Sequence, residues 1–454
     1  MGNEHIITIA ALGPDSGELL TMGALSAMKA ADALVLRTAR HGVADMLKSR
    51  GVAFTTLDAL YEQTEDFDEL CAYAAKKLIG MARENGGLCY AVSEPVSDAT
   101  VRKLACALPE DIALTVIGGV PLCANAAAAA LPFGVDTENL RTLTALSLDD
   151  YRPEGDCPQV ITEIDNRYLA SDVKLWLGDL FEDEMTVYFL ADASKPGVKA
   201  EPILLCDLDR QAHYDHRTAV LVPAVSVYER SRASFEDFVK VIRRLRAPGG
   251  CPWDRAQTFH TLRQYMIEEA CEAAEAMDGD NPDKIADELG DVLLQVVLNS
   301  CIGAEHRDFT DRDVTSMAAH KMITRHEHVF GKARAENAGE VVSVWESVKK
   351  KERGEQSALE RIKEVPASLP ALMRAQKSMR RLAQSRGEKP EVSALAAQAA
   401  EAASLLCDPQ AGEEAVADAL MQICALADAM GLDAECALRG GVMRLIAQLE
   451  REDA

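Results

Sequence analysis

Two pairs of acidic residues, placed symmetrically about a turn signal, constrain this chain more than any other stretch. The first pair is Glu269 and Glu272, and the second is Glu288 and Asp291, each within a helical pattern. Residues three or four apart share one face of a helix, so each pair points in one direction. The turn signal at 278–283 lies midway between the pairs. An antiparallel helical hairpin would therefore bring four carboxylates to one level.

The helix that carries the second pair is predicted to be buried, because its apolar residues lie nearly all round it. They are Ile285, Leu289, Val292, Leu293, Val296, Val297 and Leu298. Gly290 lies between the acids, where a larger side chain would block close helix packing. No lysine or arginine is interleaved with either pair, so a bound cation is the expected compensating charge. Mg²⁺ fits best because it is hard and takes oxygen ligands, and Mn²⁺ is the alternative.

Composition limits the partners and the compartment of the chain. Lysine and arginine total 48 against 73 acidic residues, a net charge of −25, which argues against nucleic acid or anionic membranes as passive partners. The 12 cysteines include no Cys-x-x-Cys pair, as expected for a reduced chain without a zinc module. The N-terminus lacks a signal-peptide pattern. The expectation is a cytoplasmic protein that binds neither nucleic acid nor a membrane.

The first half of the chain, residues 1–225, alternates short β-branched runs with helical patterns. Strands are predicted at Ile6–Ala10, Ala33–Leu36, Val52–Thr56, Leu88–Val92 and Leu114–Ile117, and helices at Leu19–Ala31, Asp68–Arg83 and Asp98–Leu108. This alternation predicts βαβ units and a mostly parallel sheet. Further strands near Gln159–Ile164, Thr186–Leu190, Ile203–Cys206 and Ala219–Val222 predict a smaller α/β lobe.

Several phrases in this half resemble the tetrapyrrole-methylase fold, in the arrangement of YabN-like bacterial proteins, where it precedes a pyrophosphohydrolase module. They include Leu12-Gly13-Pro14, Leu36–His41, Asp66–Glu69 and Ala170–Leu175. In that family a glycine-rich first loop, and a second loop that begins with glycine, let the backbone approach S-adenosylmethionine. Ala11, Asp15 and Glu94 stand at the altered positions in this chain. The resemblance therefore implies a retained fold in which S-adenosylmethionine binding is weakened or lost.

A polar linker near residues 228–234 is expected to precede a helical domain at 235–355. Trp253, in the sequence Cys-Pro-Trp-Asp, is one of only three tryptophans. Its ring either packs the loop onto a core or supports a nucleobase. Lys321 and Arg325 lie four apart on one helical face. Such residues are ordinarily solvated, but near a carboxylate–metal centre they become phosphate contacts.

Four motifs in this domain, in this order, resemble MazG nucleoside triphosphate pyrophosphohydrolases. They are Cys-Pro-Trp-Asp at 251–254, the acidic motifs at 268–291, Lys-x-x-x-Arg-His-x-His-Val-Phe at 321–330 and Val-Trp-Glu-x-x-Lys at 344–349. The resemblance implies the following roles: Glu269, Glu272, Glu288 and Asp291 as magnesium ligands, Glu268 as the carboxylate that orients or deprotonates water, and Lys321, Arg325, Trp345 and Lys349 as nucleotide contacts. It further implies hydrolysis of an NTP or dNTP to the monophosphate and pyrophosphate, in a homodimer or larger homo-oligomer.

The last part of the chain, residues 366–454, is helical and alanine-rich. Residues 427–438 resemble the segment that follows the metal helix in the second copy of tandem MazG proteins. Ala415 and Asp418 stand where that copy would carry Glu-x-x-Asp, and residues 395–401 lack paired glutamates. The interpretation is a degenerate second MazG-like repeat that packs or dimerises.

The predicted architecture is multidomain, with a two-lobed α/β domain at 1–225 followed by two all-α helical domains at 235–355 and 366–454. Two other functions compete with nucleotide hydrolysis. The first is an S-adenosylmethionine-dependent methyltransferase of the tetrapyrrole-methylase type with an accessory helical domain. The second is a catalytically silent regulatory or scaffolding protein whose carboxylates hold a structural metal.

Overall fold

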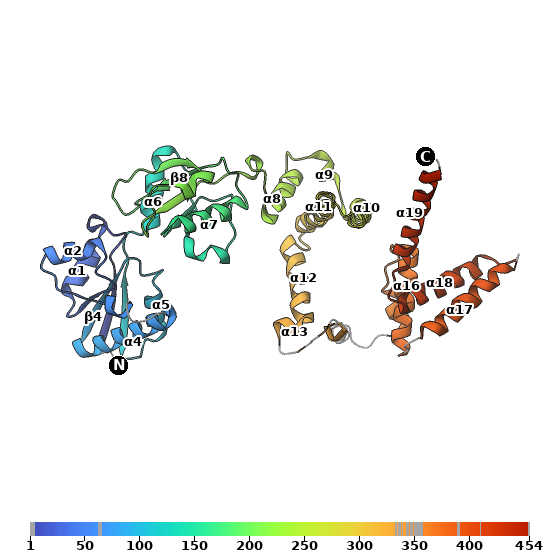
Figure 1. Cartoon of the computed structure of the whole chain (residues 1–454), viewed down its shortest axis with the longest axis horizontal. Coiled ribbons are helices and arrows are strands. Elements are labelled where there is room, and N and C mark those ends of the chain that lie inside the picture. Colours follow the sequence, from blue (N-terminus) through green and yellow to red (C-terminus); the bar gives the residue numbers. More distant parts are fainter. Residues whose placement is uncertain are drawn as a thin grey trace. The chain divides into compact units, whose positions relative to one another are not determined.

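The chain forms two compact units, Met1–Ile302 and Gly303–Ala454. In the computed structural model the described residues are 5–61, 66–331, 334, 337, 339–341, 345, 348, 357–387, 391–408 and 410–452. The first unit contains two β-sheets and a helical hairpin, and the second is helical throughout its described part (Figure 1). The predicted order of an α/β half followed by an all-α half is confirmed. The predicted domain boundaries near 225–235 and 355–366 stay predictions.

The first sheet is parallel throughout and has helices on both faces. Its strands, in the spatial order β3-β2-β4-β1-β5, are β1 (His5–Ala11), β2 (Leu34–Leu36), β3 (Thr55–Thr56), β4 (Gly87–Val92) and β5 (Ile112–Ile117). One face packs on α3 (Asp58–Tyr61), α4 (Phe67–Asn85) and α5 (Ala99–Cys106), and the other on α1 (Met22–Ala30) and α2 (Gly42–Ser49). Strands covered on both faces read as continuous apolar runs, which is why the sequence predicted this sheet correctly.

The second sheet is mixed and mostly antiparallel. Its spatial order is β6-β7-β10-β8-β9, with β6 (Arg141–Thr144), β7 (Gln159–Thr162), β8 (Thr186–Leu190), β9 (Glu201–Leu204) and β10 (Ala219–Val222). Helix α6 (Leu122–Ala130) packs on one face and α7 (Arg167–Gly178) on the other. The predicted smaller α/β lobe is confirmed. Strand β6 was not predicted, and β9 begins two residues before its predicted position.

Four helices complete the first unit and share one small core. They are α8 (Phe235–Arg246), α9 (Pro252–Ala256), α10 (Phe259–Asp278) and α11 (Pro282–His306). Val239 and Ile242 of α8 pack against Leu262 of α10 and against Val297 and Leu298 of α11. The core lies at the end of the hairpin away from the turn, so the turn end is left outside it.

A buried ion pair fixes the start of α8. The side chains of Arg230 and Asp237 are only 2% and 5% exposed, and their nearest nitrogen and oxygen atoms are 3.1 Å apart. Asp237 also accepts a hydrogen bond from the Ser234 backbone N–H at 2.9 Å and completes a capping box. Burial alone would raise the pKa of Asp237, but the hydrogen bonds from Arg230 and Ser234 outweigh burial and lower it. Asp237 is therefore an ionised helix cap.

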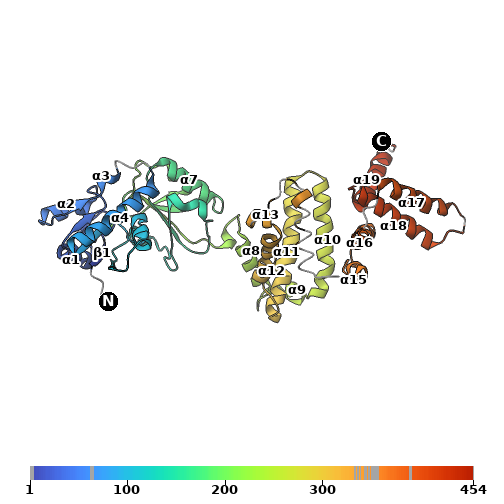
Figure 2. The same ribbon diagram turned by 90° about the horizontal axis from the view of Figure 1, so that it is seen from below.

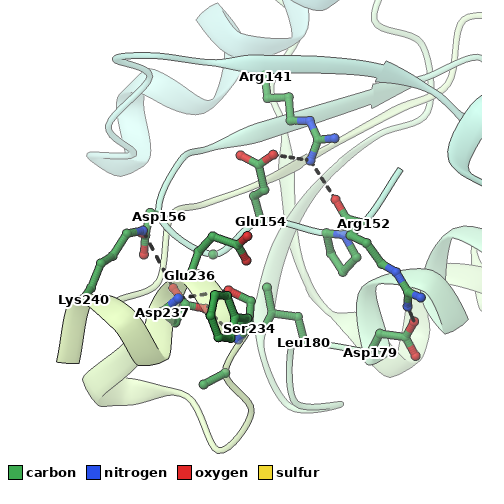
Figure 3. A pocket seen from close by; sticks show the side chains of 14 residues that line it. Arg141, Arg152, Glu154, Asp156, Asp179, Leu180, Ser234, Glu236, Asp237 and Lys240 are labelled. Carbon is green, nitrogen blue, oxygen red and sulfur yellow. Dashed lines mark hydrogen bonds and ion pairs between the residues drawn. The ribbon is translucent and has the colours of Figure 1, made fainter. Parts of the chain in front are cut away.

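A cavity of about 760 Å³ lies beside this pair, between the second lobe and α8 (Figure 3). Its charged side chains pair with one another: Arg141 with Glu154 at 3.1 Å, Arg152 with Asp179 at 3.8 Å, and Lys240 with Asp156. Each of these six charges has a partner of opposite sign, so the three pairs together add no net charge to the lining of the cavity.

The second unit consists of α12 (Asp311–Arg325), α13 (Glu327–Phe330), α15 (Ala358–Lys363), α16 (Ala371–Arg386), α17 (Val392–Ser404), α18 (Glu413–Ala429) and α19 (Ala434–Glu452). Gln376 of α16 is buried and links three elements. Its amide nitrogen donates to the Leu432 carbonyl at 2.8 Å, and its amide oxygen accepts from the Ala434 N–H at 2.9 Å. These bonds anchor the start of α19 to α16.

Within the described ranges no single helix has the length and apolar character needed to cross a membrane. The bent pair formed by α18 and α19 passes the same test only when the two helices are taken together.

Candidate metal centre

Helices α10 and α11 form the predicted antiparallel hairpin and lie side by side along their length (Figures 1 and 2). Thr258 caps α10 through a hydrogen bond from the Thr261 N–H. In the turn, Asp280 adopts a left-handed φ of 53°, and the Asn281 side chain accepts from the Asp283 N–H at 3.1 Å. The turn residues thus supply the caps that two adjacent helix ends require.

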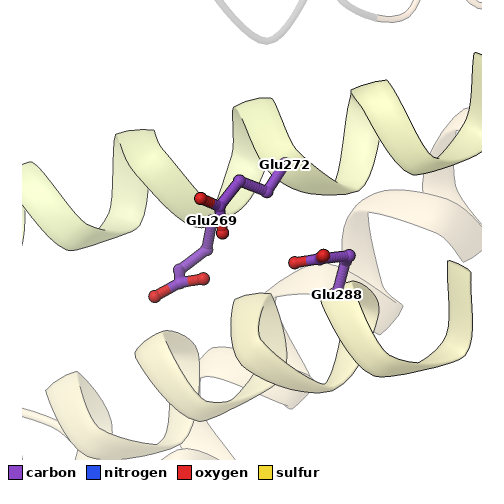
Figure 4. Close-up of side chains that lie close together, drawn as sticks. All are labelled: Glu269, Glu272 and Glu288. Atoms are coloured by element: carbon purple, nitrogen blue, oxygen red, sulfur yellow. The ribbon is translucent and has the colours of Figure 1, made fainter. Parts of the chain in front are cut away.

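Three of the predicted ligands converge across the hairpin. Glu269 and Glu272 of α10 and Glu288 of α11 each offer a carboxylate oxygen, and these oxygens lie within 4.8 Å of one another (Figure 4). Glu269 and Glu288 are half-buried, whereas Glu272 is exposed. A single cation with oxygen ligands at about 2.0–2.6 Å would fit between oxygens at this spacing.

The electrostatics of this cluster are unfavourable without a cation. Burial, followed by the negative charges of Asp291, Glu272, Glu288 and Glu268, raises the pKa of Glu269. No lysine or arginine in the described ranges forms an ion pair with these carboxylates. Like charges gathered in this way disfavour ionisation, and a bound cation reverses the sign of that effect. The donor set, all carboxylate oxygen, fits a hard ion such as Mg²⁺.

The two remaining acids of the motif lie at the margin of the cluster. Asp291 is half-buried and close enough to raise the pKa of Glu269, but it is outside the group of three. It also lines a cavity of about 490 Å³ between α8 and α11. Glu268 is exposed and accepts a hydrogen bond from the Gln264 amide at 2.9 Å. Gln264, one turn before Glu268, was not predicted, although its i,i+4 spacing signals the contact.

Two predictions about α11 are wrong. Only its second half is buried, whereas Leu289 and Leu293 beside the cluster are 45% and 37% exposed. A Cβ atom added at Gly290 would meet no other atom within 4 Å, so this glycine does not serve close helix packing. The reason is the same in both cases: the small core covers the second half of α11, whereas Gly290 and Leu293 line a cavity between α8 and α11.

Trp253, on α9, lies beside the carboxylate helix rather than in the small core. Its ring is 54% exposed and meets Tyr265 of α10 edge to face, with ring centroids 6.0 Å apart. Tyr265 precedes Glu269 by one helical turn and so shares its face. This places an exposed aromatic pair next to the first carboxylate.

The predicted nucleotide contacts on the later motifs belong to the second unit. Lys321 and Arg325 are on α12, which has no buried residue. The Arg325 guanidinium carbon lies 5.5 Å from the centroid of the Trp345 ring, a cation–π distance. Two separate motifs therefore meet within this unit. Lys349 lies outside the described residues.

In the α/β half, the altered first loop is closed by its own acidic residue. Asp15 has a left-handed φ of 66°, and its carboxylate accepts from the Gly42 N–H at 2.5 Å. The same carboxylate lies 3.6 Å from Arg217 of the second lobe and 3.7 Å from His41. A side chain thus fills the approach that a glycine would leave open.

The second altered loop carries an acid as well. Burial, together with the neighbouring Glu163 of the second lobe, raises the pKa of Glu94. These side chains place negative charge along both loops. Asp15 and Glu94 therefore place a carboxyl group in each of the two loops where the sequence analysis expected backbone access.

The fold and the site define a two-part protein, an α/β half followed by a helical hairpin with facing carboxylates. Residues 257–330 match the family model described as the MazG nucleotide pyrophosphohydrolase domain. The uncharacterised protein YabN of Bacillus subtilis is 32% identical over 375 residues, which cover 82% of this chain and 76% of that protein. The chain belongs to the MazG nucleotide pyrophosphohydrolase family, in the fused form represented by YabN.

Two further similarities concern one part of the chain each. The Thermotoga maritima protein named nucleoside triphosphate pyrophosphohydrolase/pyrophosphatase MazG is 35% identical over 220 residues, which cover 48% of this chain and 84% of that protein. A crystal structure of uroporphyrin-III-C-methyltransferase from Thermus thermophilus matches with a TM-score of 0.36 and 18% identity, over 49% of this chain and 94% of that one. The structural likeness is too slight to bear on function.

Mg²⁺ is expected to stabilise the fold through this cluster. At one hundred times its dissociation constant, a ligand that binds only the folded state adds about 2.7 kcal/mol to the free energy of unfolding. In thermal denaturation the wild-type melting temperature should therefore rise with added Mg²⁺. Glu269→Gln should lose this rise. In EDTA it should melt above the wild type, because the substitution removes a carboxylate that repels its neighbours.

The matched control is Glu275→Gln, an exposed glutamate on α10 outside the cluster, which should keep the full response to Mg²⁺. A Glu269→Gln variant that gains as much from Mg²⁺ as the wild type would show that the ion binds elsewhere.

Proposed function

We propose that the helical hairpin hydrolyses nucleoside triphosphates, ribo- or deoxyribo-, to the monophosphate and pyrophosphate with Mg²⁺ as cofactor. The observation that carries this proposal is the convergence of Glu269, Glu272 and Glu288 without a compensating basic residue in the described ranges. Membership of the MazG family supports it, as does the printed name of the Thermotoga maritima relative.

The proposed ligands are the three converging glutamates together with Asp291. Half-burial of Glu269, Glu288 and Asp291 orients these groups and limits their hydration. Mg²⁺, when bound, supplies neutralisation of phosphate charge and a water of lowered pKa. The exposed side of Glu272 leaves the cluster open to a triphosphate, which such an ion normally takes as part of its coordination shell.

Glu268 is the proposed base. Its carboxylate is exposed, and Gln264 holds it through one hydrogen bond. A water oxygen would form a bond to the α-phosphorus while the bond from that phosphorus to the bridging oxygen of the β-phosphate breaks. Glu268 would accept the proton of the water, and pyrophosphate would leave with the bridging oxygen.

The roles of the basic and aromatic residues rest on their motif positions. Lys321, Arg325 and Lys349 are assigned to the charge of the triphosphate and of the departing pyrophosphate. Trp345 is assigned to the nucleotide, and its contact with Arg325 supports a joint role. The exposed Trp253 ring beside Tyr265 favours contact with a nucleobase over burial in a core.

The exposed apolar residues of α11 support a homodimer. Leu289 and Leu293 lie one turn apart beside the carboxylate cluster, where a monomer would leave them in water. Apolar surface next to a polar site marks an interaction surface. A second copy of the chain, covering this end of the hairpin, would bury both residues and shield the carboxylates from bulk solvent.

The alternative activity, methyl transfer by the α/β half, is disfavoured by the two loops. Asp15 closes the first loop with hydrogen bonds and ion pairs, and Glu94 places a carboxylate in the second. The other alternative is a catalytically silent scaffold. Only a measurement of nucleotide hydrolysis distinguishes it from the hydrolase.

The hydrolase proposal predicts that Glu269→Gln and Asp291→Asn each lower pyrophosphate release by about 100-fold or more, because each removes a proposed metal ligand. The measurement is phosphate detection with added inorganic pyrophosphatase, over a panel of NTPs and dNTPs with Mg²⁺. Glu275→Gln should retain wild-type activity. Circular dichroism should show unchanged helix content in all three variants. Full activity in either ligand variant, or none in the wild type with any nucleotide, contradicts the proposal.

The homodimer proposal predicts that Leu293→Gln shifts the chain toward the monomer and lowers activity with it, since a polar group would be buried in the interface. Light scattering coupled to size-exclusion chromatography measures the mass. Tyr168→Gln is the control, because Tyr168 is 84% exposed on α7 of the α/β half and lies outside the hairpin. A wild-type chain that is monomeric at micromolar concentration and active would sink the idea.

The closed loops predict that the full-length protein does not bind S-adenosylmethionine. Isothermal titration calorimetry should show no saturable heat with the cofactor, while the same preparation remains active on nucleotides. Saturable one-to-one binding would overturn the interpretation of Asp15 and Glu94.

A further inference from the structure

The predicted degenerate repeat contains a cavity that has no part in the reaction proposed for the α10–α11 hairpin. It lies within the second unit, between α16, α17 and α18, and has a volume of about 710 Å³. This volume is within the range of about 300–1,000 Å³ that is usual for small-molecule sites. Two buried residues, Leu395 and Ala425, contribute to an apolar wall.

The helix that forms one side of this cavity has a charge opposite to that of the whole chain. Helix α16 contains five basic residues and no acidic one, a net charge of +5, whereas the chain has −25. Its basic residues are Arg374, Lys377, Arg380, Arg381 and Arg386, of which Arg380 and Arg386 line the cavity. Arg380 pairs with Asp428 and Arg381 with Glu364, so the lining itself has two arginines and one carboxylate, a net charge of +1 that attracts anions.

The position of Arg380 is fixed by two other side chains. Its Nε donates to Asp428 Oδ1 at 2.7 Å, and the same oxygen accepts from the buried Gln376 amide at 3.2 Å. Asp428 is the one carboxylate among the lining residues, and it is engaged in this network. A hard cation therefore finds no set of carboxylates here. The chemistry differs in kind from that of the α10–α11 hairpin.

The remaining polar groups of the cavity are primary amides. Gln384, Gln398 and Gln422 come from α16, α17 and α18, one from each helix. Each amide offers donors and an acceptor, the pattern that matches the edge of a nucleobase. Guanidinium groups match phosphate, and the apolar wall matches a flat ring. Inorganic phosphate alone would leave most of the volume and all of the apolar wall unused.

We propose that this cavity binds a nucleoside monophosphate directly, without a metal ion, as a second nucleotide site whose residues are separate from those of the hairpin. Arg386 binds the phosphate beside the Arg380–Asp428 ion pair, and the three glutamines contact the base. This binding does not require the proposed hydrolase activity.

The test is isothermal titration calorimetry of the full-length protein with AMP, GMP, CMP and UMP in excess EDTA. Chelation removes the metal through which the hairpin would bind phosphate. At least one monophosphate should bind saturably with one site per chain, and more tightly than inorganic phosphate. Arg386→Gln should weaken this binding at least tenfold. Ala394→Phe, which narrows the cavity without changing its charge, should do the same.

Two controls separate this site from its alternatives. Lys377→Gln removes one positive charge from the same helix outside the cavity and should bind within twofold of the wild type. Glu269→Gln should bind normally in EDTA even though its hydrolase activity is lost. Circular dichroism and melting curves confirm that each variant is folded.

Three outcomes would overturn the proposal. The first is the absence of saturable monophosphate binding in EDTA. The second is an equal loss in Lys377→Gln and Arg386→Gln, which would indicate general attraction to a basic helix. The third is binding that weakens as protein concentration rises, which would show that a second copy of the chain occupies the cavity. Failure of the hydrolase proposal alone leaves these results unchanged, since no turnover is measured.

Discussion

Mutual repulsion among carboxylates on the α10–α11 hairpin is the constraint on which this site depends. Glu269, Glu272 and Glu288 converge from two helices, and the charges of Asp291 and Glu268 add to the field at Glu269. In water such an arrangement would relax by moving the side chains apart. The helix backbones cannot move apart, since α10 and α11 are tied by a short turn at one end and by an apolar core at the other, so only side-chain rotation can separate the carboxylates. A bound cation would offset this repulsion.

The two halves of the chain differ in how well their residues match the motifs that the sequence analysis compared them with. The helical hairpin keeps every acidic position of its motif, and its geometry suits the ion that those positions predict. The α/β half keeps both sheets, yet Asp15 bonds to Gly42 and reaches Arg217 across the lobes. That contact gives the altered loop a structural use, as a link between the first sheet and the second.

Much of the fold followed from local patterns. The strands of the first sheet are short apolar runs bounded by turns, and the hairpin is symmetric about a turn with proline at the first position of α11. Strand β6 was missed because Arg141–Thr144 has only one buried residue in four, so its sequence lacks the apolar signal. The burial of α11 was overestimated for the opposite reason. Hydropathy indicates that Leu289 and Leu293 are more stable when buried. It does not indicate whether other residues of this chain bury them.

The sequence by itself determined which carboxylates share a helix face and at what level along the two helices they lie. These follow from the helical period and from the position of one turn, both of which are local. Only the tertiary structure decided what each group touches. Three glutamates converge while Asp291 stays at the margin, Trp253 lies against Tyr265, and the basic helix α16 lines one cavity with Gln398 of α17 and Gln422 of α18. Such contacts depend on how distant segments pack, and no local pattern encodes that.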